Sequence, residues 1–91
     1  MKYMITWQID PGAYKATVES FLEGGAPVPE GMKTLGRWHT PGSISGWHLV
    51  EGDVETLAQH VAEWGAKIDL EVFPVIEDEA AASSLSKIYG K

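Results

Sequence analysis

Cysteine is absent from the 91-residue chain. Without thiols the protein can have no disulfide scaffold, thiolate metal site or cysteine nucleophile, and this absence is compatible with a reducing cytoplasm. A chain of this length forms one domain, residues 1–91, whose single core is marginal in size. With 44% hydrophobic residues and no covalent staple, such a domain gains stability by burying surface in an oligomer. We therefore expect a homodimer.

Positive charge is also scarce, since seven Lys and Arg residues face thirteen Asp and Glu residues and leave a net charge of -6. A surface of this kind has few cations to replace the counterions of a polyphosphate, which argues against nucleic acid as a partner. No apolar run approaches the roughly 20 residues that cross a bilayer, and the N-terminal residues do not have the pattern of a signal peptide. The expectation is a cytoplasmic protein without membrane or nucleic-acid partners.

Hydrophobic periodicity predicts seven elements in the order strand, helix, strand, strand, helix, strand, helix. Asp10 followed by Pro11 predicts the start of the first helix, and the pair Gly24-Gly25 predicts its end. Asp53 is the expected N-cap of the second helix. The expected elements span residues 2–9, 11–24, 32–39, 46–51, 54–64, 68–75 and 77–89.

This order is the α+β, ferredoxin-like βαββαβ pattern with a C-terminal helix appended. Right-handed crossovers then give an antiparallel sheet in the order 4-1-3-2, with both long helices on one face. The open face is expected to carry the apolar residues Leu35, Val50, Phe73 and Val75. A second copy of the chain would cover that face and form a dimeric α/β barrel.

The hairpin at residues 35–51 contains two of the four tryptophans, two of the three histidines and an arginine. A symmetric turn pairs Arg37 with His48, Trp38 with Trp47 and Leu35 with Val50. Because side chains alternate along a strand, Arg37, His39 and His48 then share one face of the sheet. A one-residue bulge would reverse the faces of one strand, so the register and the face remain open.

The polar residues of the four strands are predicted to converge at one end of the open face. The helix-covered face should be the more apolar one, with Tyr3, Ile5, Trp7, Ile9, Leu70 and Val72. The predicted ligand-binding residues are the polar ones left for the open face, namely Thr6, Gln8, Arg37, His39, His48, Asp69 and Glu71.

Within this set, His39, His48 and Glu71 are the catalytic candidates. A carboxylate near a histidine raises its pKa and orients its tautomer, which gives an acid or base near neutral pH. Arg37 would hold a carboxylate or an enolate oxygen. The alternative is a structural network of Arg37, His39 and Glu71 that only sets the dimer register.

No cofactor or metal ion is expected. The sequence has neither an HxH nor an HExxH motif, and haem, with His39 or His48 as axial ligand, is a lesser option. His60, in the second helix, is expected to be an exposed surface histidine. The tryptophans Trp38, Trp47 and Trp64 are expected to anchor the core or an interface.

Several segments resemble a family of short, mostly bacterial proteins described as a domain of unknown function, within the dimeric α/β-barrel superfamily. They are Met-Ile-Thr-Trp at 4–7, Pro-Gly at 11–12, Leu-Gly-Arg-Trp-His at 35–39, Gly-Trp-His-Leu-Val-Glu at 46–51 and Glu-Val-Phe-Pro-Val at 71–75. The Gly-Arg-Trp-His segment is the most specific of them. The resemblance covers nearly the whole chain and implies two sheets packed face to face around a ligand.

Two functions remain from the sequence. The first is a small dimeric protein that binds a small organic molecule in the barrel interior and, if it is an enzyme, transforms it by proton transfer or oxygenation. The second is a non-catalytic interaction or regulatory dimer. Fold resemblance alone does not transfer a function, so the sequence leaves open whether the protein is an enzyme.

Overall fold

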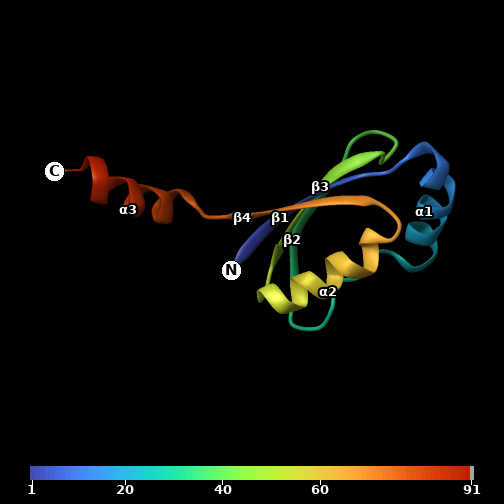
Figure 1. Cartoon of the computed structure of the whole chain (residues 1–91), viewed down its shortest axis with the longest axis horizontal. Coiled ribbons are helices and arrows are strands. Elements are labelled where there is room, and N and C mark those ends of the chain that lie inside the picture. Colours follow the sequence, from blue (N-terminus) through green and yellow to red (C-terminus); the bar gives the residue numbers. More distant parts are fainter. Residues whose placement is uncertain (91) are drawn as a thin grey trace.

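The structure is a computed structural model that describes residues 1–90. Four strands and three helices follow one another in the predicted order (Figure 1). The strands are β1 (Lys2–Gln8), β2 (Lys33–His39), β3 (Ser45–Glu51) and β4 (Asp69–Val75). The helices are α1 (Pro11–Gly24), α2 (Val54–Gly65) and α3 (Asp78–Tyr89).

The strands form one antiparallel sheet in the order β2-β3-β1-β4, which is the predicted order read from the other edge. The α+β, ferredoxin-like topology is therefore confirmed. Helix α1 connects β1 with β2, and α2 connects β3 with β4, and neither pair of strands is adjacent in the sheet. These two crossovers allow β1 and β4 to pair although they are far apart in the sequence.

The helix ends follow the local chemistry that the sequence predicts. Pro11 opens α1, and Gly25 ends it with a φ of 69°, where its N–H donates to the carbonyl oxygen of Phe21 over 2.7 Å. The Asp53 carboxylate caps α2 by accepting from the Thr56 N–H over 2.8 Å. Asp10 occupies the cap position of α1, but its side chain makes no capping hydrogen bond.

The core lies between α2 and one half of the sheet. Its buried side chains are Ile5, Met32, Val50 and Leu57, and Val50 is fully buried. Partly buried side chains that pack against this cluster are Tyr3, Val28, Val61, Leu70 and Val72. The core therefore occupies only part of the face that the helices cover.

Helix α1 stands away from the sheet, whereas α2 packs against β4. No Cα atom of α1 lies within 8 Å of another helix or strand in residues 1–90. In Figure 1, α2 lies along the sheet and α1 lies beyond its end. The gap between α1 and the sheet is bridged by long side chains, among them Tyr14, whose hydroxyl donates to the Gly42 carbonyl oxygen over 2.7 Å.

Helix α3 extends away from the rest of the molecule at the end of β4 (Figure 1). Within the described residues its Cα atoms also stay more than 8 Å from every other element. Leu85, Ile88 and Tyr89 are exposed on it, so an apolar side of α3 faces solvent.

The register of β1 and β3 corrects the predicted faces. Ile5 pairs with His48 and Tyr3 pairs with Val50, so both β3 residues lie on the side of the helices. Val50, expected on the open face, is in fact fully buried in the core. The hairpin pairing of Arg37 with His48 is confirmed, as is that of Trp38 with Trp47.

A register shift between Thr34 and Gly36 interrupts the hairpin ladder. Thr34, rather than Leu35, is therefore the partner of Val50. An extra residue of this kind bends the strand and reverses the faces beyond it, which a symmetric hairpin does not anticipate.

Candidate functional site

The seven predicted ligand-binding residues separate onto opposite faces of the sheet. The outer face, which no helix covers, carries Thr6, Gln8, Asp69 and Glu71, as predicted. The register pairs Thr6 with Glu71 and Gln8 with Asp69. The hairpin residues Arg37, His39 and His48 share a face, also as predicted, but it is the face toward the helices. The predicted convergence of all seven residues is therefore wrong. Its cause is the β1–β3 register, because antiparallel partners share a face and His48 is the partner of Ile5.

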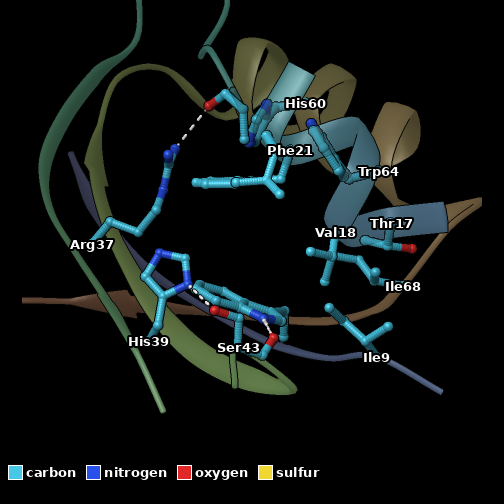
Figure 2. A pocket seen from close by; sticks show the side chains of 13 residues that line it. Ile9, Thr17, Val18, Phe21, Arg37, His39, Ser43, His60, Trp64 and Ile68 are labelled. Carbon is cyan, nitrogen blue, oxygen red and sulfur yellow. Dashed lines mark hydrogen bonds between the residues drawn. The ribbon is translucent and has the colours of Figure 1, made fainter. Parts of the chain in front are cut away.

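A cavity of about 190 Å³ opens between α1, α2 and the sheet, beside the core. Its lining is mainly apolar and aromatic: Trp7, Ile9, Val18, Phe21, Leu22, Ala26, Trp64 and Ile68. Its polar lining residues are Thr17, Arg37, His39, Ser43 and His60. Figure 2 shows Arg37 and His39 reaching in from one side, with Phe21, His60 and Trp64 on the other.

The cavity exists because α1 stands off the sheet and because one glycine makes room for a tryptophan. A Cβ atom on Gly46 would collide with the six-membered ring of Trp7 and with the Trp38 carbonyl oxygen. Gly46 thus lets the Trp7 ring lie against β3. The indole N–H of Trp7 donates to the Ser43 carbonyl oxygen over 3.2 Å and fixes the ring there.

Arg37 places a positive charge in this apolar setting. Its Nη2 donates to the Ala26 carbonyl oxygen over 2.8 Å and to His48 Nε2 over 3.2 Å. No carboxylate forms an ion pair with Arg37 in residues 1–90. Burial lowers the pKa of the Arg37 guanidinium, but the group stays charged at neutral pH because its ordinary pKa is so high.

His48 is held in the neutral form. Its Nε2 lies 3.2 Å from the Arg37 guanidinium, which can only donate, and 2.9 Å from the Thr34 hydroxyl. Nε2 must therefore accept, and the ring proton is on Nδ1. Burial, then the charge of Arg37 and the nearby His60 lower the pKa of His48 from 6.5 to about 4.

His60 is buried, which corrects the expectation of an exposed histidine. Only 5% of its surface is exposed, and its ring centroid is 6.0 Å from that of His48. Its Nδ1 is buried without a hydrogen-bond partner in the described part of the chain. Burial lowers the pKa of His60, although Glu63 opposes the shift. The sequence held the signal, since His60 follows Leu57 by three residues and so lies on the buried stripe of α2.

His39 lines the opposite wall of the cavity. Its ring meets those of Trp7 and Phe21 edge to face, with centroid separations of 5.1 and 5.5 Å. Its Nδ1 is 3.0 Å from the Ser43 hydroxyl. Glu71 is on the outer face, so the predicted pairing of a carboxylate with His39 or His48 is not formed.

A family model described as a domain of unknown function, DUF3303, matches residues 1–89. The chain belongs to the DUF3303 family. No curated protein and no solved structure matches it. The chemistry of this DUF3303 domain must therefore be inferred from its own side chains.

The histidine and acidic side chains of the DUF3303 domain, which could act as metal ligands, are dispersed. Residues 1–90 contain no group of three or more histidine and acidic residues placed to hold a metal ion. As an axial haem ligand, His48 would have to give up the hydrogen bonds that its Nε2 makes to Thr34 and Arg37.

Across residues 1–90, no helix is both long enough and apolar enough to cross a membrane.

The outer face of the DUF3303 domain is aromatic and exposed. Trp38, Trp47 and Phe73 are exposed by 54%, 46% and 46%, respectively. Trp38 and Trp47 are cross-strand partners, and Phe73 pairs with Met4 on the same face. These side chains do not belong to the core, contrary to one of the two roles expected for the tryptophans. The other role, an interface, remains a prediction.

Proposed function

We propose that this DUF3303 domain binds a small organic molecule in the cavity between the sheet and helices α1 and α2. One observation carries the proposal: Arg37 and His60, two polar groups with hydrogen-bonding capacity that residues 1–90 leave unused, line the same mainly apolar cavity. Small-molecule sites have this composition, with a predominantly apolar lining and a few convergent polar groups.

The hairpin supports the proposal because its polar side chains face the helices and its large apolar side chains face outward, the reverse of the usual arrangement around a core. Arg37 and His48 face the helices, where burial favours apolar residues, whereas Trp38 and Trp47 face outward. Natural sequences depart from hydrophobic patterning chiefly where function requires it. Both departures meet in one hairpin, with the cavity on its inner side.

The side chains support binding more strongly than a reaction. If the protein is an enzyme, proton transfer and oxygenation are the expected reactions, and the expected acid or base for proton transfer is a histidine beside a carboxylate. In residues 1–90 neither His39 nor His48 forms an ion pair with a carboxylate. The function we infer is therefore recognition of a small molecule, with Arg37, His39 and His60 as its polar contacts.

A fragment screen by ligand-observed NMR tests the proposal when it is repeated on two matched variants. Val18→Phe adds a ring to the cavity wall, whereas Val54→Phe adds the same ring at an exposed position of α2. Fragments that bind the native protein should be lost with Val18→Phe and kept with Val54→Phe. Fragments that bind both variants equally occupy another place and would contradict the proposal.

A homodimer that buries the outer face is a second candidate, and it would make the chain a dimeric α/β barrel. The exposed Trp38, Trp47 and Phe73 favour it, because monomers rarely leave so many large aromatic side chains together in water. Such a dimer is compatible with an interaction or regulatory module. Native mass spectrometry tests it, and a monomer at micromolar concentration would contradict it.

A further inference from the structure

The proposed cavity has an uncompensated positive charge. The chain has an excess of acidic residues, with a net charge of -6, yet none of them pairs with Arg37 in the described residues. The neighbours that Arg37 does contact are uncharged: a carbonyl oxygen of Ala26 and the accepting nitrogen of His48. Only Nη2 takes part in those bonds, so within residues 1–90 the N–H groups of Nη1 and Nε keep free donors.

A guanidinium in apolar surroundings is costly unless an anion and further hydrogen bonds compensate for its lost hydration. A second group nearby is also unsatisfied, because His60 is buried and its Nδ1 has no partner in residues 1–90. Both side chains line the same cavity (Figure 2). The charge and the remaining N–H donors of Arg37 therefore lack a complement, which a negatively charged acceptor would supply.

We propose that the cavity takes a small aromatic carboxylic acid, with its carboxylate on Arg37 and its ring among Trp7, Phe21 and Trp64. This inference rests on the proposed function, whose site it specifies. A planar guanidinium with free donors matches the two oxygens of a carboxylate. The aromatic side chains match a ring in shape and in stacking geometry.

The size of the cavity limits the size of the acid. An engineered apolar cavity of roughly 150 Å³ takes up benzene. A cavity of about 190 Å³ therefore has room for one ring with a short carboxylate-bearing side chain, whereas a sterol or a long fatty acid would extend out of it. Phenylacetate is a probe of this size.

Three probes of the same shape separate the charge of the ligand from its bulk. They are phenylacetate, the neutral 2-phenylethanol and the cationic 2-phenylethylamine. Binding is followed by the indole N–H resonances of the tryptophans in ¹H–¹⁵N NMR spectra of the full chain. Trp7 and Trp64 line the cavity, whereas Trp38 and Trp47 lie on the outer face and provide the control within each spectrum.

Phenylacetate should shift the Trp7 and Trp64 resonances and leave those of Trp38 and Trp47 in place. It should bind about tenfold or more tightly than 2-phenylethanol, because a hydrogen bond to a charged group is worth that factor. Arg37→Gln should remove this preference, and Arg37→Lys should restore part of it. Lys33→Gln, which removes one positive charge from an exposed position of the same strand, should leave the preference intact.

The outcomes separate the two proposals. Equal binding of phenylacetate and 2-phenylethanol, or tighter binding of the amine, overturns the carboxylic acid and leaves the cavity as a binding site. If none of the three probes shifts Trp7 or Trp64, the aromatic carboxylic acid is overturned, and the fragment screen separately decides whether the cavity binds any small molecule. The comparison among probes uses the native protein, so it stands even if Arg37→Gln does not fold.

Discussion

The Arg37 guanidinium donates a hydrogen bond to His48 Nε2 across adjacent strands, over 3.2 Å. This contact makes His48 an acceptor and keeps its ring neutral, since a protonated imidazole would oppose a donor and a positive charge. The positive charge at this place therefore remains on Arg37 alone. Both the stability and the proposed binding of the protein depend on this arrangement.

The free energy of unfolding should fall as the pH is lowered through the range in which His48 is protonated in the unfolded chain but stays neutral in the folded protein. Its pKa is 6.5 when unfolded and about 4 when folded, so the unfolded state binds more protons between these values. The contribution of His48 to the free energy of unfolding is therefore fully present well above pH 6.5 and falls by on the order of 3 kcal/mol toward pH 4. His60 adds to the loss, because burial lowers its pKa as well.

Urea denaturation between pH 4 and pH 8 measures this dependence. Arg37 and His60 are the charged or titratable groups that act on His48. His48→Gln should therefore reduce the slope of the curve and leave the smaller part that His60 contributes. His39→Gln, at an exposed position, is the control and should retain the slope. A curve for the native protein that is flat from pH 6.5 to pH 4 would show that His48 titrates normally.

Gly46→Ala should destabilise the protein by roughly 1–3 kcal/mol, the usual cost of forcing an extra carbon into a packed site. The added Cβ atom meets the Trp7 ring and the Trp38 carbonyl oxygen, and the backbone oxygen cannot move aside easily. Gly12→Ala is the matched control, because nothing lies within 4 Å of its Cβ position in α1. Thermal denaturation should show a lower Tm for Gly46→Ala and an unchanged or higher Tm for Gly12→Ala. Equal Tm values would mean that the Trp7 ring is not packed on Gly46.

His60→Leu should stabilise the protein while weakening ligand binding. The substitution replaces a buried, unsatisfied nitrogen with an apolar group, a change worth about 1 kcal/mol or more. Denaturation in urea gives the stability, and the NMR titration with phenylacetate gives the affinity. A variant that is less stable than the native protein would mean that Nδ1 of His60 is satisfied in solution, for example by water.

Trp47→Glu should dissociate the proposed homodimer, because it buries a carboxylate in an apolar interface without a partner. Val54→Glu introduces the same charge at an exposed apolar position of α2 and should leave the dimer intact. Native mass spectrometry at several protein concentrations distinguishes these states. Loss of the dimer in both variants would show that added charge, rather than the position, is responsible.

The strand order and the hairpin pairs next to the turn, Arg37 with His48 and Trp38 with Trp47, could be predicted from the sequence, whereas the shift that pairs Thr34 with Val50 could not. Alternation identifies the strands, and the turn at residues 40–44 sets which residues of β2 and β3 are opposite. The faces of that hairpin could not be predicted in this way. They depend on the long-range register of β1 with β3, in particular on the pairing of Ile5 with His48.

Hydrophobicity indicated the wrong side, since Trp38 and Trp47 are more apolar than Arg37 and His48. Reasoning from the most apolar core therefore places the two tryptophans on the helix-covered face of the sheet and the polar residues on the open face. The same reasoning missed His60, because the residue type suggested exposure while its spacing from Leu57 indicated burial. The cavity itself follows from the distance between α1 and the sheet, which no local pattern encodes.

Because side chains alternate strictly along β3, substitutions on its two sides affect different properties of the protein. Gly46, His48 and Val50 point toward the helices, while Trp47 and Leu49, between them, point outward. A library that varies only Trp47 and Leu49 would therefore alter self-association and leave the core intact, whereas one that varies Gly46, His48 and Val50 would first change the stability of the fold. The outer face of β3 can therefore change its side chains while the buried side keeps the packing that holds the sheet to α2.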